Sequence, residues 1–405
     1  MKNLEDNNNI FLSADERMRF RKSLFVHAVK RDELPFRVPN LANIFTWKVV
    51  DSPYTLTEGI YDYDKLFDIE CMLHKKYNFD LYSNTGIRNV LNFSDCFGKD
   101  TCYFINDETY SINYPDSASI ADADDMPDFF EKGLVRYYFE RGICRKYELT
   151  DTADVIERFK KAAPEFIKIG QFRERINSYY ENVFGVPNWA AFVPEFPCDT
   201  LFKAIRGMKG FSIDLRRNPE YIEEGLKTVD EHFFPILKAN MEKAEDVPNV
   251  AFAGGRGISL CHTVLNAKQF EKYHWPYIKR YVDMAKAKGL ICSLFFESSI
   301  DAYFDILRDL PEKTVGLQIE LTDAKLAKEK LPNVTIMGGY PNNLLGFGTV
   351  LECIDKAKEV LDDLAYDGNY IFTTDKMMSF PADAKPENLM AVNSFIREYG
   401  VYRRQ

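Results

Sequence analysis

The sequence predicts an α/β protein built as a (β/α)8 barrel. From about residue 185 onward, short apolar runs alternate with amphipathic segments, which is the pattern of βα units around a parallel sheet. Six such units follow one another, and no glycine fingerprint of the dinucleotide-binding kind follows any predicted strand. Together these observations favour a closed barrel over an open, doubly wound sheet.

The regular part of the barrel is predicted element by element. Its expected strands are the segments 188–193, 249–254, 289–296, 314–320, 333–339 and 369–375. The expected helices, with apolar residues at i, i+3, i+4 and i+7, are 269–288, 300–310, 323–331, 350–367 and 387–400. Gly289 and Gly368 follow two of these helices, as residues that end a helix commonly do.

The N-terminal part is less regular. Residues 1–80 are predicted to form a helical extension, with amphipathic helices at 14–30 and 62–79. Segment 79–84 is predicted to be the first barrel strand. The turn-rich stretch 90–125 indicates a hairpin or excursion on the barrel rim. Because repeats, linkers and low-complexity segments are lacking, we expect the 405 residues (1–405) to form a single domain.

Composition excludes several classes of partner. A formal net charge of −10 argues against nucleic acid, since binding to phosphate backbones requires clustered Lys and Arg. No window reaches about 18 consecutive apolar residues, and the first residues lack a secretory signal, so we expect a cytoplasmic protein without membrane partners. The eight cysteines contain no CxxC pair and are interpreted as reduced thiols. The less favoured alternative is that Cys198 or Cys261 takes part in chemistry.

Four segments of the chain resemble the uroporphyrinogen decarboxylase superfamily. They are 196–224, 269–290, 333–361 and 387–400, and they occur in the family's order. The superfamily consists of (β/α)8 barrels and includes corrinoid-dependent methyltransferases as well as the haem-pathway decarboxylases. The resemblance therefore implies the same fold, and the family's habit implies a homodimer.

The resemblance is closer to the methyltransferase branch than to the decarboxylases. The decarboxylases resemble one another in an arginine-rich loop that pairs with substrate carboxylates, whereas the corresponding segment 43–54 here has one lysine and no arginine. A substrate with many carboxylates needs several cationic partners. Uroporphyrinogen is therefore not the expected substrate.

In the methyltransferase branch, an H-x-C motif on one strand and a cysteine on the last strand hold zinc. The resemblance places Phe295, Glu297 and Asp375 at these three positions. Two of the replacements are carboxylates at the C-terminal ends of strands, where barrel enzymes carry their active sites. Glu297 and Asp375 are therefore predicted to be catalytic, although Glu297 is also suited to cap the following helix.

A metal at these carboxylates would need a third ligand. His262 follows the predicted strand 249–254, so Glu297, Asp375 and His262 form a candidate Zn2+ site; a hydrogen-bonded histidine is the alternative. Glu195, after another strand, is a further candidate ligand or base, or else an exposed loop acid. Arg256 lies between glycines and is suited to fix a carboxylate or phenolate.

Aromatic residues near the predicted loops indicate a pocket for a flat organic molecule. Apolar pockets with a few polar groups suit small ligands, and aromatic walls match flat rings. We expect two or three of the candidates to line the pocket and the others to lie in the core. The candidate substrate-binding residues are Trp189, Phe192, Phe196, Phe295, Phe296 and Tyr340.

The first hypothesis is a methyltransferase that moves a methyl group from a small, methoxylated aromatic donor to a corrinoid cofactor on a partner protein. An aryl methyl ether is a poor methyl donor until its oxygen is protonated or bound to a Lewis acid, and Glu297 and Asp375, with or without a metal, would supply that activation. The second hypothesis is a cofactor-independent decarboxylase of a small aromatic or heterocyclic acid held by Arg256. A non-catalytic tetrapyrrole or corrinoid binder ranks last because a D-x-H-x-x-G motif is lacking.

Overall fold

The computed structural model describes residues 12–83, 86–87, 90–98, 104–113 and 119–402. Its centre is a set of short parallel strands, and the C-terminal half supplies a five-stranded sheet in the order β11-β10-β9-β8-β7. These strands are β7 (Arg256–Ser259), β8 (Cys292–Phe296), β9 (Val315–Gln318), β10 (Thr335–Met337) and β11 (Tyr370–Ile371).

The remaining strands continue the sheet into a barrel. β1 (Leu41–Ala42) pairs in parallel with β2 (Leu81–Tyr82), and β5 (Asn188–Ala190) pairs with β6 (Val250–Phe252). Phe372, directly after β11, exchanges backbone hydrogen bonds with Pro39 and Leu41, which joins the last strand to the first. β6 and β7 are two halves of one strand interrupted at 253–255. Counting them once gives eight strand positions in the described part of the chain, and the predicted (β/α)8 barrel is confirmed.

The first strand differs from the prediction. The strand within the predicted segment 79–84 is β2 (Leu81–Tyr82), and it holds the second strand position, because Leu41–Ala42 precedes it and lies within the predicted helical extension 1–80. A two-residue strand that is buried on both faces carries no periodic pattern. Its hydrogen-bond partners, Phe372 and the residues of β2, are far away in sequence, so nothing local marks it.

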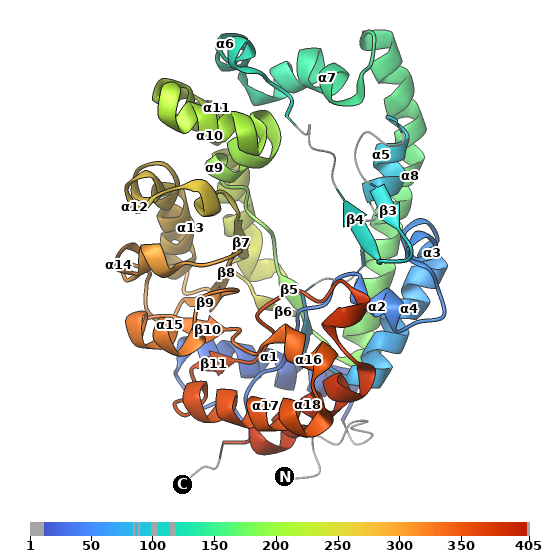
Figure 1. The fold of residues 1–405 in the computed structure, drawn as a ribbon, viewed down its shortest axis with the longest axis vertical. Coiled ribbons are helices and arrows are strands. Elements are labelled where there is room, and N and C mark those ends of the chain that lie inside the picture. The colour runs from blue at the N-terminus through green and yellow to red at the C-terminus, as the bar shows by residue number, and fades with distance from the viewer. Residues whose placement is uncertain (1–11, 84–85, 88–89, 99–103, 114–118, 403–405) are drawn as a thin grey trace.

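Helices surround the barrel and close its N-terminal end (Figure 1). The ring includes α13 (Trp275–Ala287), α15 (Ala324–Lys330), α17 (Val350–Leu364) and α18 (Pro386–Tyr399). α1 (Ala14–Lys30) starts with a Ser13–Glu16 capping box and packs Phe25 against Phe252 and other residues of the barrel strands. Shorter helices are α2 (Trp47–Val50), α3 (Leu56–Tyr61), α7 (Ile143–Tyr147), α12 (Ala267–Gln269), α14 (Phe304–Leu307) and α16 (Asn342–Phe347).

Two groups of helices extend beyond the barrel on opposite sides of the view in Figure 1. One contains α4 (Tyr63–Tyr77), α5 (Val90–Asp95) and α8 (Thr152–Tyr179) beside the antiparallel hairpin β3 (Phe104–Asn106) and β4 (Ser111–Asn113). The other contains α6 (Met126–Tyr137), α10 (Gly207–Arg217) and α11 (Pro219–Lys243). The hairpin lies within the predicted excursion 90–125, whereas the 28-residue helix α8 was not predicted.

A buried ion cluster holds the closed end of the barrel. Asp80, at the start of β2, accepts two hydrogen bonds from Arg37 at 2.6 and 2.7 Å and one from the Asn40 backbone at 2.9 Å. Arg21 of α1 and Arg397 of α18 lie 3.8 and 3.9 Å from the same carboxylate. Burial alone would raise the pKa of Asp80, but the guanidinium groups, Arg37 foremost, lower it. The cluster joins both chain ends to the strands.

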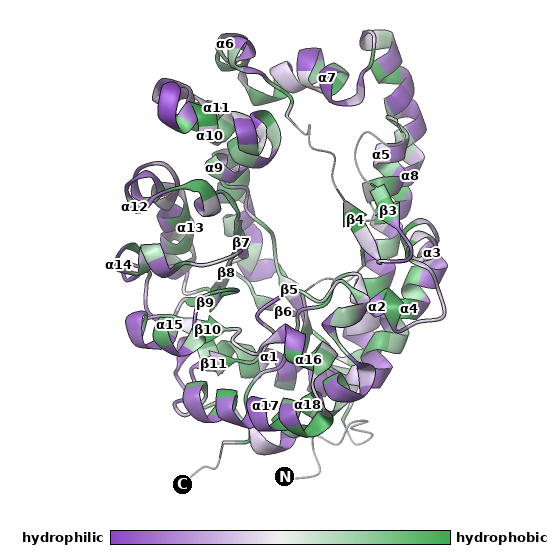
Figure 2. Ribbon diagram, in the orientation of Figure 1, coloured by the Kyte–Doolittle hydropathy of each residue, from purple (hydrophilic) through white to green (hydrophobic). Residues whose placement is uncertain are grey.

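The distribution of hydrophobic residues agrees with this arrangement of helices around the strands. In Figure 2, helices such as α15 and α17 carry both hydrophilic and hydrophobic residues, as expected for helices with one face on the barrel. Among the helices that the structure describes, none has both the length and the hydrophobicity required to cross a lipid bilayer.

Candidate functional site

The strands β7 and β8 present two different faces, because successive side chains of a strand alternate. Ser293 of β8 points into the barrel, where its hydroxyl accepts a 2.9 Å hydrogen bond from Trp189 Nε1. Phe296 points the other way, where its ring meets the ring of His262 at 5.1 Å. We call these the barrel face and the helix face. Glu297 follows Ser293 and Phe295 in the alternation, so it falls on the barrel face, at the C-terminal end of the strand.

Arg256 is the cation of the barrel face. Its guanidinium carbon lies 3.9 Å from the ring centre of Trp189 and 5.9 Å from that of Phe295, and its Nη1 donates to the Ser83 carbonyl at 3.2 Å. Its buried Nε atom has no hydrogen-bond partner among the described residues. Burial lowers the pKa of Arg256 to about 10, which leaves the group charged at neutral pH. This stacked cation is suited to bind an anionic group next to an aromatic ring.

Carboxylates gather where the strands end. β8 and β9 pair Phe295 with Gln318, so Glu297 and Glu320 each follow two residues after this pair. Glu320 accepts a 2.8 Å hydrogen bond from the Ser298 backbone. Glu320 was not predicted as a site residue, although it ends strand 314–320 in the same way as Glu297 follows strand 289–296. These two acids therefore lie on one rim of the barrel.

Asp375 belongs to the same rim. Its Oδ1 atom accepts a 2.8 Å hydrogen bond from the Asn342 backbone. Burial raises the pKa of Asp375, and the nearby charge of Glu320 adds to this rise, while backbone N–H groups of Asn342 and Lys376 partly offset it. A half-buried carboxyl group with a raised pKa can hold a proton and deliver it to a bound molecule.

The structure does not assemble the predicted metal trio. His262 is buried on the helix face, and its Nδ1 atom lies 3.1 Å from the Ser259 hydroxyl oxygen. Burial lowers the pKa of His262 to about 4. Glu297 and Asp375 lie at the barrel mouth, and Phe295, at the position of the zinc-binding histidine, offers no ligand atom. The residues at the mouth therefore do not fit the zinc that the resemblance implies, and no step of the reaction is assigned to a metal there.

A different group of ligand-type residues lies on the helix face. In the described part of the chain, Cys198, Cys261 and His274 form the one set of three whose ligand atoms all lie within 4.8 Å of one another. Burial raises the pKa of the Cys198 thiol, but hydrogen bonds from Cys261 and His274 outweigh it and lower the pKa to about 7. Burial also opposes charge on His274, whereas Asp199 raises the pKa of its ring.

Three of the predicted aromatic residues belong to the core. Phe196 packs against His274 and Phe296 against His262, both on the helix face, and both phenylalanines are buried. Tyr340 is fully buried and donates to a carbonyl of α17 at 3.0 Å. We assign these three to packing, because their side chains are buried against core residues.

The other predicted residues lie on the barrel face or on a neighbouring loop. Trp189 and Phe295 flank Arg256, and Phe192 is half-buried with its carbonyl accepting a 2.9 Å bond from the Arg256 backbone. Glu195 forms a 2.6 Å, partly exposed ion pair with Lys203, which is the arrangement of a loop acid.

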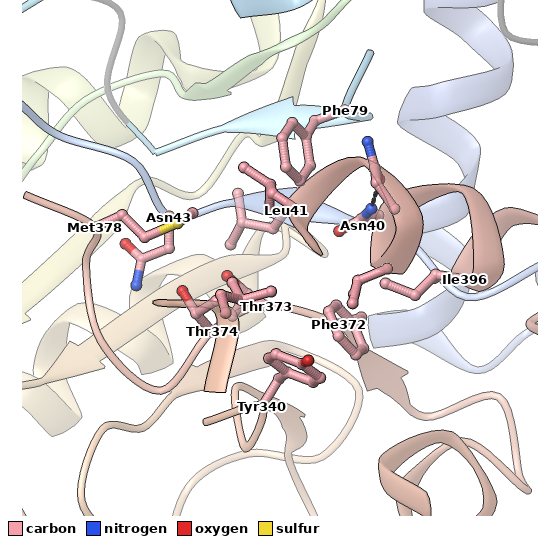
Figure 3. Close-up of a pocket in the computed structure, with 14 residues that line it drawn as sticks. Asn40, Leu41, Asn43, Phe79, Tyr340, Phe372, Thr373, Thr374, Met378 and Ile396 are labelled. Carbon is pink, nitrogen blue, oxygen red and sulfur yellow. Dashed lines mark hydrogen bonds between the residues drawn. The ribbon is translucent and has the colours of Figure 1, made fainter. Parts of the chain in front are cut away.

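A small cavity lies behind the barrel wall, between β11 and α18 (Figure 3). Tyr340, Phe372 and Ile396 are among the residues that line it, and it has room for about 10 Å3 of water. This volume holds about one water molecule, so the cavity cannot admit an organic substrate. The barrel face at the mouth remains the candidate active site.

Comparison with known protein families gives the class of the protein. The family model for uroporphyrinogen decarboxylase (URO-D) matches residues 197–399, about half of the chain, and the protein belongs to this family. Among solved structures, the chain is similar to a methyltransferase from Methanosarcina mazei, with a TM-score of 0.59 and 14% sequence identity over 94% of this chain and 98% of that chain. This likeness shows a common fold. The search of curated proteins found no match.

Proposed function

We propose that the protein is a methyltransferase that takes a methyl group from a small, methoxylated aromatic donor and passes it to a corrinoid cofactor carried by a partner protein. The observation that carries this proposal is the stacking of Arg256 on Trp189, with Phe295 beside it, on the face that leads to the acids of the barrel mouth. Membership of the family and the fold shared with a methyltransferase support it. A cytoplasmic location and a homodimer are part of the same proposal.

The chain binds and orients the donor in this mechanism. The donor ring lies along Trp189 and Phe295, and an anionic substituent such as a carboxylate pairs with Arg256. The methoxy group then points towards the C-terminal ends of the strands, where Glu297 and Asp375 lie. The reduced corrinoid, when bound, supplies the nucleophile that accepts the methyl group.

The acids of the rim make the ether a better methyl donor. As the bond between the methyl carbon and the aryl oxygen breaks, its electron pair stays on that oxygen, which becomes a phenol by taking a proton. Asp375 is the proton donor in this proposal, because burial raises its pKa and so favours the protonated form relative to an exposed aspartate. Glu297, on the same rim, donates a second hydrogen bond to the ether oxygen when it is protonated. No zinc is required for these steps.

A decarboxylase of a small aromatic acid is the second candidate function. The same arrangement favours it, since Arg256 would hold the substrate and Asp375 would protonate the carbanion-like centre left after loss of carbon dioxide. It requires no cofactor, and this difference separates the two candidates.

The deciding experiment offers methoxylated benzoates to the purified protein with cob(I)alamin, while methylcobalamin is followed by absorbance and carbon dioxide is collected. We expect methylcobalamin from at least one donor and little from the Glu297→Gln variant. Glu195→Gln, which changes an acid in a surface ion pair, is the matched control and should react normally. Carbon dioxide without methyl transfer would favour the decarboxylase, and binding without either product would favour a carrier.

A further inference from the structure

The helix face of β7 and β8 contains a polar cluster that the proposed reaction does not use. Cys198 comes from α9 (Pro197–Thr200), Cys261 from the turn η7 (Cys261–Val264) and His274 from the turn η8 (Phe270–His274). All three side chains are fully buried. Three separate segments therefore bring two thiols and an imidazole together where hydrophobic side chains would otherwise pack.

Three buried polar atoms around the cluster lack a well-formed hydrogen bond in the described part of the chain. They are Nδ1 of His274, which lies beside the Cys198 thiol, Oδ2 of Asp199, which lies 3.5 Å from His274 Nε2, and Nε2 of His262. A buried polar atom that is left fully unpaired costs about 1–3 kcal/mol, so weak pairing in the interior is uncommon. The position of these atoms around two thiols is suited to a site that a bound cation completes.

The surrounding groups hold the cluster in place. Asp199 Oδ1 accepts hydrogen bonds from the Leu260 and Cys261 backbones at 2.8 and 2.7 Å. His274 Nε2 lies 2.8 Å from the Ser259 hydroxyl and 3.5 Å from Asp199 Oδ2. The Ser259 hydroxyl fixes Nε2, which orients the ring and leaves Nδ1 for the metal.

We propose that Cys198, Cys261 and His274 bind a zinc ion, and that the adjacent Asp199 carboxylate, which lies outside this set of three, rotates to supply the fourth ligand. Thiolate and imidazole are the ligands that zinc prefers in closed, structural sites. Tetrahedral zinc places such ligand atoms about 3.5–3.8 Å apart, so a set within 4.8 Å needs only small side-chain rotations. Binding releases the protons of the two thiols to solvent.

The site lies apart from the barrel mouth and does not depend on the proposed methyl transfer. Its ligands join α9, η7 and η8, three segments that follow the ends of β5 and β7 or lead into α13. The ion therefore fixes the loops behind the candidate active site and takes no part in the reaction. Because all the ligands are buried, the site leaves no position open for substrate.

Metal content per chain tests the proposal. The protein is grown with added zinc, purified without chelator and measured by mass spectrometry, together with Cys198→Ser, Cys261→Ser and the control Cys353→Ser, a buried cysteine outside the cluster. We expect about one zinc ion per chain in the wild type and in the control, and a loss of at least about fivefold in the two cluster variants. The double variant Glu297→Gln, Asp375→Asn should keep its zinc.

A second measurement decides the matter if the cluster variants do not fold. Cobalt(II) is exchanged into the wild-type protein, and thiolate-to-cobalt charge-transfer bands are expected, together with release of zinc when thiols are capped by a mercurial. Absence of metal, zinc retained by folded cluster variants, or zinc lost only with Glu297 and Asp375 would overturn the proposal. So would a disulfide between Cys198 and Cys261 in the protein as purified.

Discussion

The barrel face and the helix face of β7 and β8 are made by alternate residues of the same strands, yet they differ in chemistry. On the barrel face, Arg256 is partly exposed and stacked on aromatic rings, and Glu297 follows at the mouth. On the helix face, Ser259 contacts two buried histidines beside two thiols. The barrel face is arranged for a ligand that binds and leaves, and the helix face for an ion that stays bound. Neighbouring residues of the same strand belong to these two different faces.

The largest expected effect concerns the acid of the barrel mouth. Asp375→Asn should reduce methyl transfer by about 100- to 10,000-fold, the usual contribution of a proton donor. Since the reactive form is protonated, the wild-type rate should fall as pH rises through the raised pKa of Asp375, and the residual rate of the variant should lack this dependence. Rates of methylcobalamin formation across pH measure both, and an unchanged profile would contradict the assignment.

The next effect concerns the cation of the barrel face. Arg256→Met should raise KM for a carboxylated donor by about 10- to 150-fold, because a hydrogen bond to a charged group contributes about 1.5–3 kcal/mol. An uncharged methoxybenzene makes no such contact and should bind equally well to both proteins. Steady-state kinetics with the two donors check the prediction, and an equal loss for both would assign Arg256 to structure.

The next prediction concerns the contribution of the helix face to the stability of the fold. Asp199→Ala leaves the Leu260 and Cys261 backbone groups and the His274 ring without their partner, so we expect a loss of about 2–3 kcal/mol in the free energy of unfolding. Glu195→Ala, a change in an exposed ion pair on the neighbouring loop, should cost at most about 1 kcal/mol. Urea unfolding of both variants measures the two losses in the free energy of unfolding. Equal losses would mean that Asp199 contributes no more to stability than an exposed ion pair.

The smallest effect is the pH dependence of stability from Asp375. Its pKa is higher in the folded state than in the unfolded chain, so the stability from this group is present at low pH and lost as pH rises through the folded pKa. The Asp375→Asn variant lacks this loss. Thermal unfolding of both proteins at stepped pH should show the wild type weakening relative to the variant as pH rises; the opposite trend would mean that the pKa is lowered.

The barrel could be predicted from sequence because its C-terminal units repeat a local pattern. The strand Leu41–Ala42 could not be predicted, since two residues are too few to show an alternating pattern. Its hydrogen-bond partners, residues 81–82 and 372, are distant in sequence. The long helix α8 has buried residues at 155, 162, 169, 172 and 176, a narrow stripe that is easily overlooked between polar residues.

The site was predictable only in part. The sequence indicated that Glu297 and Asp375 follow strand ends. It did not show that the neighbours Phe295 and Phe296 point to opposite faces of the strand in the fold. The cluster of Cys198, Cys261 and His274 joins three distant segments, which no local motif records. The signal that was present is that Cys198 and Cys261 each follow a predicted strand by a few residues.

The most direct test of the two-face account is a crystal structure with anomalous diffraction at the zinc absorption edge, after soaking with a methoxylated benzoate. The account predicts one zinc peak between Cys198, Cys261 and His274, no zinc between Glu297 and Asp375, and the benzoate carboxylate on Arg256. A zinc ion held by Glu297 and Asp375 at the barrel mouth would contradict it.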